Sequence, residues 1–168
     1  AALDAGATHA THFYDVFPVP PEADSGVRPA GVVETMLADP RATVDFIADG
    51  VHVHPMAIRA AVAAKGWAGV SLITDSNIGA GLSPGVHDTP WGYAVRVREG
   101  DGARHAERGF LAGSALTMNR GMAHLLPWLD RPPGPGWALG TRNPPPPHGL
   151  ADRGRIRVGA RAGSVLWA

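Results

Sequence analysis

The first guide to this sequence is what it lacks. There is no cysteine among the 168 residues, which excludes disulfides, thiol nucleophiles and cysteine-ligated zinc, so any metal would be held by His, Asp or Glu. The formal net charge is zero, which leaves no electrostatic handle for nucleic acid or an anionic membrane. No run reaches the roughly 18 consecutive apolar residues of a membrane span. We therefore expect neither nucleic acid nor a membrane as partner.

The given sequence does not open with a charged stretch followed by an apolar one, the pattern that is typical of a leader segment. We therefore expect a cytoplasmic protein. The composition, with 45% hydrophobic and 18% charged residues, is typical of a soluble globular protein with a sizeable core. Eight histidines supply candidate metal ligands.

Strand-like and helix-like segments alternate along the first part of the chain. Residues 7–11, 43–48 and 70–74 are short apolar runs with strand character. Apolar residues recur at helical spacing within 32–37, after the first run, and within 58–65, after the second. This alternation predicts a parallel sheet covered by helices, which is an α/β fold.

The pattern changes after the third run. A long loop rich in Gly and Pro is followed by alternating apolar residues in 93–97 and a second run in 106–111. These predict a β-hairpin insertion near 91–111 that turns around 99–102. Met and Leu at helical spacing then predict an amphipathic helix over 118–129, with its apolar stripe in the core.

Proline dominates the chain after Asp130. The stretches RPPGPGW and RNPPPPHGL predict irregular structure, because proline lacks the backbone N–H that helices and sheets use. Beyond them, residues 155–158 and 164–167 each have the pattern of a short strand, joined by Gly-rich turns. We expect these two strands to belong to a separate small sheet.

Polar residues follow all three predicted strands, namely His12, the segment 49–54 and Asp75. Catalytic groups in parallel α/β folds gather at this end of the strands. Asp75 after an apolar strand is either solvated, paired, metal-bound or a cap of the following turn. In GATHATHFYD the spacing of three places His9 and His12 on opposite faces. His9 is then the candidate packed histidine and His12 the candidate metal ligand.

Five stretches together carry a family resemblance: ATHFYD, IADGVHVHP, LITD, LAGSALTM and GLADRGRIRVGARAG. In this order and spacing the chain resembles the C-terminal half of the N-acetylglucosamine-6-phosphate deacetylase family of the amidohydrolase superfamily. The resemblance implies the C-terminal part of a (β/α)8 TIM-like barrel of a metal-dependent hydrolase. Residues 1–150 would form the partial barrel with its hairpin insertion, and residues 151–168 would give short strands of a small β-domain.

The resemblance also implies the chemistry of amino-sugar metabolism. His12 matches a metal ligand, Asp75 a catalytic acid/base, and His52 a substrate-binding residue that polarises the scissile carbonyl. The other implied substrate-binding residues are Asp15, Val16, Arg28, Leu111, Ala112 and Gly113. A divalent metal ion is the implied cofactor, with zinc as the first expectation and iron or another divalent metal as alternatives. The implied partners are a small N-acetylated sugar and, for the full-length protein, further copies of itself.

Two departures from the family pattern keep alternatives open. Asp15 and Val16 stand where the family commonly has Asn-Ala, and a carboxylate there would repel a sugar phosphate. An unphosphorylated N-acyl compound is therefore an alternative substrate, although Arg28 could take the family's phosphate-binding role. A complete barrel needs roughly 250 residues, and the family's metal-binding glutamate and another histidine find no match here. A non-catalytic truncated fragment is therefore a second alternative.

Overall fold

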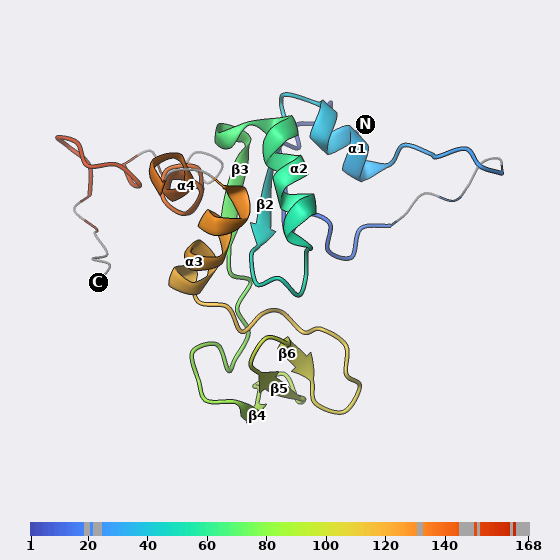
Figure 1. The fold of residues 1–168 in the computed structure, drawn as a ribbon, viewed down its shortest axis with the longest axis vertical. Helices are drawn as coiled ribbons and strands as arrows, with labels where there is room; N and C mark the ends of the chain where they lie inside the picture. The colour runs from blue at the N-terminus through green and yellow to red at the C-terminus, as the bar shows by residue number, and fades with distance from the viewer. Residues whose placement is uncertain are drawn as a thin grey trace.

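The structure is a computed structural model, which describes residues 1–18, 21, 25–130, 133–144, 150, 152–161 and 163. Within these residues the elements in chain order are β1 (His9–Ala10), α1 (Val32–Ala38), β2 (Thr43–Ile47), α2 (Pro55–Lys65), the 3₁₀ helix η1 (Trp67–Gly69), β3 (Val70–Ile73), β4 (Gly85–Asp88), β5 (Ala94–Arg98), β6 (Gly102–His105), α3 (Met118–Leu129) and α4 (Pro133–Gly140) (Figure 1). None of the described helices is both long and apolar enough to cross a membrane.

A parallel sheet with the strand order β1-β2-β3 forms the centre of the molecule, which confirms the predicted α/β arrangement. β2 and β3 pair from Val44 opposite Val70 to Ile47 opposite Ile73. β1 is shorter than the predicted run because the backbone leaves the extended conformation at His12, whose φ is +38°. Each strand thus ends just before its polar residues.

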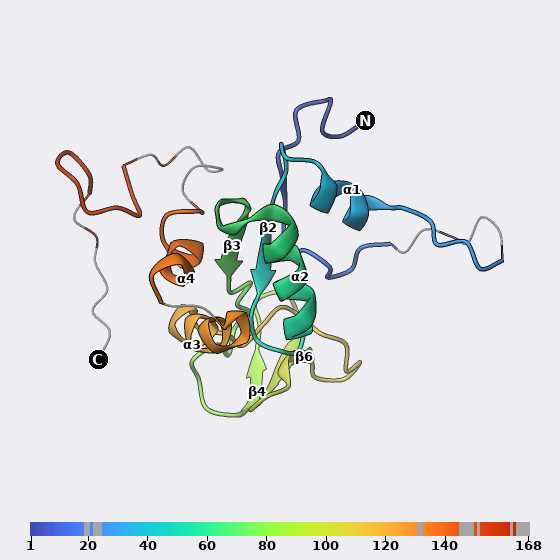
Figure 2. The ribbon, with the colours of Figure 1, turned by 45° about the horizontal axis from the view of Figure 1, so that its top comes forward.

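Helices pack against this sheet to make the core. In Figures 1 and 2, α2 lies across β2, with α1 on one side of it and α3 on the other. Phe46 of β2 and Leu72 of β3 are each 1% exposed and share a core with Ile58 of α2 and Met122 of α3. The apolar periods of strands and helices therefore meet on one face, as the sequence predicts. α2 begins at Pro55, and His54 Nδ1 accepts a hydrogen bond from an N–H of its first turn at 3.2 Å.

The predicted hairpin insertion is present as a second, antiparallel sheet with the order β4-β5-β6. It lies below the parallel sheet in Figure 1. Its last strand occupies 102–105, so the prediction of a strand across 106–111 is wrong. Residues 106–109 instead make a second turn, closed by a bond from the His105 N–H to the Phe110 carbonyl at 2.9 Å. β4 was not predicted, because it arises in a Gly- and Pro-rich loop with little alternation.

The proline-rich stretch after Asp130 is more regular than predicted. α4 forms across Pro133–Gly140 because both of its prolines lie in the first turn, where backbone N–H groups have no helical acceptor. Asn143 follows α4, is 8% exposed, and donates to the carbonyls of Trp67 and Val70 at 2.5 and 2.7 Å. This amide fastens the end of α4 to the start of β3.

Of the two predicted C-terminal strands, only the first lies within the described residues. Residues 155–158 make bends and a turn rather than a strand, so that prediction is wrong. A strand needs a neighbour to accept its hydrogen bonds, and none of the described residues pairs with this segment. The second predicted strand, 164–167, lies outside the described residues.

Candidate functional site

The polar residues predicted for the site stand at the same end of the parallel sheet. His12 follows β1, Asp49 and His52 follow β2, and Asp75 follows β3. Because the strands are parallel, their carboxyl ends share one edge, and the loops that leave them meet there.

Backbone strain is concentrated at this edge. Outside glycine, φ is positive at His12 (+38°), Tyr14 (+78°), Val16 (+50°) and Asp75 (+45°), and elsewhere in the described chain only at Asp130. A non-glycine residue in this region costs on the order of 1–2 kcal/mol and persists only where its surroundings enforce it. The first and third strand ends thus hold the predicted ligand and the predicted acid/base in uncommon conformations.

His12 carries an unused buried nitrogen. Its Nδ1 is the only buried side-chain N or O atom of the described residues that has no hydrogen-bond partner. An unsatisfied buried polar atom costs about 1–3 kcal/mol, and a neutral imidazole nitrogen with a free lone pair is a common metal ligand. His12 therefore fits the role of a metal ligand.

The rest of the donor set is incomplete within the described chain. No group of three or more His, Cys, Asp or Glu side chains there lies close enough to hold a metal ion. Since a catalytic zinc site usually has three protein ligands, the described residues by themselves do not make up a complete donor set.

His9 is satisfied, as expected for a packed histidine. Its Nδ1 lies 2.7 Å from Thr43 Oγ1, and its Nε2 lies 2.8 Å from Asp45 Oδ2. Asp45 also accepts a bond from the His12 backbone N–H at 2.5 Å. The two histidines of the opening motif thus differ as their spacing predicts.

His52 and Asp49 form a buried pair. His52 Nδ1 lies 2.7 Å from Asp49 Oδ2, and the two side chains are 1% and 8% exposed. Asp49 Oδ1 also accepts the backbone N–H groups of Val51 and His52 at 2.9 and 3.0 Å. Asp49 was not among the predicted site residues, although the spacing of three to His52 was the available signal. Its carboxylate fixes the orientation of the predicted substrate-binding imidazole.

Charges around this pair alter both pKa values. Burial by itself lowers the pKa of His52, but the hydrogen bond to Asp49 and the negative charges of Asp49, Asp15 and Asp75 outweigh burial and raise this pKa. Burial likewise opposes ionisation of Asp49, but the bonds from His52 and the backbone leave the pKa of Asp49 lowered. Asp15 and Asp75 act on His52 from the other two strand ends, so these residues share one electrostatic environment.

The segment 111–113 is joined to the Asp75 loop through the backbone. The N–H of Ser114 donates to the Asp75 carbonyl at 2.8 Å, and Asn77 Nδ2 donates to the Ala112 carbonyl at 2.5 Å. A Cβ on Gly113, whose φ is +69°, would lie 2.9 Å from the Asp75 carbonyl oxygen. The Asp75 carboxylate itself makes no hydrogen bond within the described chain, so the turn-cap alternative finds no support.

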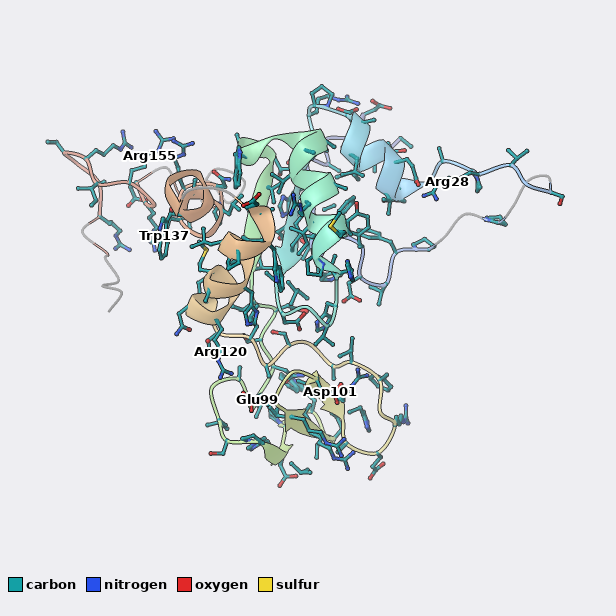
Figure 3. All side chains as sticks on the ribbon, viewed as in Figure 1. Arg28, Glu99, Asp101, Arg120, Trp137 and Arg155 are labelled. Atoms are coloured by element: carbon teal, nitrogen blue, oxygen red, sulfur yellow. The ribbon has the colours of Figure 1, made fainter. Side chains whose placement is uncertain are left out.

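Two predicted substrate-binding residues do not join this cluster. Arg28 is 85% exposed and pairs with Glu34 at 2.9 Å. Figure 3 shows Arg28 beside α1, away from the ends of the strands. Val16 is also 85% exposed. Neither contributes a contact to His12, His52 or Asp75 among the described residues.

A cavity of about 400 Å³ adjoins the Asp49 loop. It is an open hollow lined by Asp49 and Val51, by the β5–β6 turn, by the loop 79–84 and by α3. Glu99 of the turn and Arg120 of α3, both labelled in Figure 3, contribute to its lining. The hairpin insertion thus supplies one wall of a hollow next to the site.

Comparisons with known proteins give a consistent answer. No family model matches the chain. The N-acetylglucosamine-6-phosphate deacetylases of Bacillus subtilis and Vibrio furnissii are 36% and 35% identical to it, and each alignment covers 98% of the chain. The chain spans 40% and 39% of the length of these relatives.

A solved structure agrees with the sequence relatives. The N-acetyl-D-glucosamine-6-phosphate deacetylase of Mycobacterium smegmatis, in complex with N-acetyl-D-glucosamine-6-phosphate, superposes with a TM-score of 0.82 at 31% identity. The superposition covers 96% of this chain and 41% of that one. The chain therefore belongs to the N-acetylglucosamine-6-phosphate deacetylase family and corresponds to the C-terminal part of its members.

Proposed function

We propose that this chain contributes part of the active site of a metal-dependent deacetylase that hydrolyses the N-acetyl amide of N-acetylglucosamine-6-phosphate to acetate and a free amine. In this proposal the sheet β1-β2-β3 is part of a (β/α)8 barrel. The observation that carries it is the buried Nδ1 of His12, which has no hydrogen-bond partner among the described residues and lies at the strand ends where His52 and Asp75 also stand.

The residues divide the chemistry between them. His12 would hold a divalent metal ion, zinc being the first choice for an imidazole-containing site, and the ion would supply Lewis acidity toward the reacting groups. Asp75, with a carboxylate free of hydrogen bonds within the described chain, accepts the proton of the attacking water and passes it to the leaving nitrogen. His52 donates a hydrogen bond to the carbonyl oxygen as negative charge develops on it.

The surroundings of His52 support this division. Its pKa is raised by Asp49 and by the charges of Asp15 and Asp75, so the imidazole holds its proton more tightly than an isolated histidine does. A protonated imidazole is a stronger hydrogen-bond donor to a developing oxyanion than a neutral one. The main chain of 111–113, fixed against the Asp75 loop, would line the pocket that receives the acetyl group.

One observation favours a second candidate substrate. Arg28, the predicted phosphate-binding residue, is engaged by Glu34, and Asp15 adds negative charge near His52. An unphosphorylated N-acyl compound fits these charges better than a sugar phosphate does. The proposal extends to the cytoplasm as the place of action and, as the family resemblance implies, to a homo-oligomeric full-length protein.

The test compares acetate release from N-acetylglucosamine-6-phosphate and from N-acetylglucosamine, beside the zinc content of the purified protein. Replacement of His12 by Ala is expected to remove the bound metal and the activity together. His54→Ala is the matched control, because His54 is exposed and contacts only the start of α2. Preference for the unphosphorylated sugar would establish the second candidate. Absence of metal and of activity in the unaltered protein would establish the non-catalytic alternative.

A further inference from the structure

Besides the Asp49–His52 pair, the described structure holds a second buried carboxylate, which has no role in the chemistry above. It belongs to Asp45, which lies in the middle of β2 and is 4% exposed as a whole residue, among buried polar residues that are otherwise uncharged, namely Ser71, Ser114 and Asn143. A buried carboxylate without partners is strongly unfavourable. The contacts that satisfy it therefore indicate what it holds in place.

The hydrogen bonds of the Asp45 carboxylate within the described chain reach back to the first strand and its loop. Oδ2 lies 2.8 Å from His9 Nε2, and Oδ1 accepts the backbone N–H of His12 at 2.5 Å. The Asp45 carbonyl oxygen also accepts the N–H of Phe13 at 2.9 Å. Thr43, two residues earlier on the same face of β2, holds the other ring nitrogen of His9 at 2.7 Å. One residue of β2 thus fastens three residues at the end of β1.

His12, whose backbone N–H is bound by Asp45, is also a residue with a strained backbone. His12 has a left-handed φ of +38° and a buried Nδ1 that lacks a hydrogen-bond partner among the described residues. Both features are costly, and both would relax if the loop were free to rotate. Phe13 is 0% exposed and packs edge to face against Phe46 at 5.8 Å between ring centroids, which anchors the residue after His12. The anchor at His12 itself is the Asp45 carboxylate.

We propose that Asp45 is a positioning residue: its carboxylate, bonded at once to His9 and to the backbone N–H of His12, holds the His12 imidazole in a strained, partnerless arrangement ready for a metal ion. The proposal rests on the proposed function through the assignment of His12 as a ligand. It adds a residue that touches neither metal nor substrate and acts through the backbone of the ligand.

The test uses the ¹⁵N-labelled 168-residue chain and three variants. Asp45→Ala removes both bonds, and Asp45→Asn keeps an oxygen that can accept the His12 N–H. Ser71→Ala is the matched control, because Ser71 is Asp45's register partner on β3, is similarly buried at 5%, and has no bond to His12. The readouts are hydrogen exchange of the His12 amide, the His12 imidazole resonances, and the Zn²⁺ concentration that half-saturates any change in them.

We expect Asp45→Ala to speed exchange at His12 at least about tenfold, while the Phe46 amide, inside the β2–β3 ladder, keeps its protection. The half-saturating Zn²⁺ concentration should rise by about tenfold or more, the size of effect seen when groups that orient a metal ligand are removed. Asp45→Asn should retain most of the protection, and Ser71→Ala should leave His12 as in the parent chain. Asp45→Leu, which refills the lost volume, replaces the alanine variant if that variant does not fold.

Unchanged His12 exchange and imidazole signals in Asp45→Ala would overturn the proposal. Equal changes in Ser71→Ala would overturn it as well, because the effect would then be one of general core polarity. A parent chain whose His12 signals ignore Zn²⁺, combined with a loosened His12 in Asp45→Ala, would overturn the metal part of the proposal for this chain and leave Asp45 as the tether of that loop.

Discussion

The two sheets of this molecule differ in how completely their strands are buried. In the parallel sheet β2 is buried along almost its whole length, with Val44, Phe46 and Ile47 each at most 1% exposed. In the antiparallel sheet β5 is buried at Val95 and Val97 and more open at the residues between and beside them. A strand covered on both sides is a rigid support, and strained polar residues sit at the ends of this sheet.

The aromatic side chains show the same contrast. Phe13, Phe46 and Phe17 meet edge to face inside the core beneath the first strand end. On the hairpin, Trp91, Tyr93, His105 and Phe110 form a row of neighbouring rings, and Trp91 and Phe110 are 61% and 52% exposed. The parallel sheet therefore holds the site residues in place, whereas the hairpin insertion contributes one wall of the hollow next to the site.

Four predictions test this difference between the two sheets, beginning with the largest effect.

The largest effect is expected from the core of the parallel sheet. Phe46→Ala should lower the free energy of unfolding by about 3–5 kcal/mol, because a fully buried ring is lost and a cavity remains. Val95→Ala, at a residue of β5 that is equally inaccessible, should cost less because fewer buried carbons are removed. Urea unfolding of both variants measures the difference. Equal losses would mean that the two sheets support the fold alike.

The next effect concerns the contact that joins the Asp75 loop to the 111–113 segment. Gly113→Ala should destabilise the protein by about 2–3 kcal/mol, because left-handed backbone and a clash with the Asp75 carbonyl add together. Gly109→Ala on the hairpin is the matched control, since its φ is +76° and nothing lies within 4 Å of the added carbon. The control should lose about 1 kcal/mol. Thermal unfolding of the pair separates clash from backbone cost, and similar losses would contradict the packing described.

A smaller effect depends on pH and on the His52–Asp49 pair. The raised pKa of His52 contributes stability that is fully present below its ordinary value of 6.5 and is lost as pH rises through the folded value. The lowered pKa of Asp49 contributes stability above 3.8 that is lost as pH falls through its folded value. The pair is thus most stabilising between about pH 4 and 6. Asp49→Asn should cost more stability at pH 5.5 than at pH 9.

Two measurements check this. Denaturant unfolding of the parent and Asp49→Asn at the two pH values gives the stability difference, and NMR titration of His52 should show its pKa falling in the variant. A loss that is the same at both pH values would mean that the pair acts through its hydrogen bond alone.

The smallest effect is expected at the exposed end of the hairpin. Trp91→Ser removes a ring that is 61% exposed and stacked on Tyr93 at 6.0 Å between centroids. The change in unfolding free energy should stay within about 0.5 kcal/mol, as is usual for surface positions. The same denaturant series measures it. A loss of several kcal/mol would show that the aromatic row supports the fold as firmly as the core does.

The sequence predicts what depends on local periodicity. β2, β3, α2 and α3 were predicted because apolar spacing alone distinguishes a covered strand from an amphipathic helix. α4 was not predicted, because the many prolines after Asp130 indicate irregular structure. The prolines of α4 are tolerated because they lie in its first turn. β4 was missed because its partner residues in β5, such as Val97 opposite Gly85, and not its own composition, make it a strand.

For the site as well, the sequence predicts local features but not contacts between distant residues. The spacing of His9 and His12 and the resemblance to the family together predict His9 as the packed histidine and His12 as the metal ligand. The structure pairs both ring nitrogens of His9 and leaves His12 Nδ1 without a hydrogen-bond partner among the described residues. The role of Asp45 could not be predicted from the sequence, because the hydrogen bond that the His12 N–H donates to the Asp45 carboxylate joins residues 33 positions apart. Left-handed backbone at His12 and Asp75 was equally out of reach, since neither residue type requires it.

Asn143 has a consequence for the order of folding. Its two hydrogen bonds join residues 73 and 76 positions apart, with the whole hairpin insertion lying in the loop they close. Closing so long a loop carries an entropic cost that is repaid only after β3 and α3 are in place. The contact therefore belongs to the late, downhill side of the folding barrier. Its loss should speed unfolding more than it slows folding, so that this amide governs how long the native state lasts and not how soon it forms.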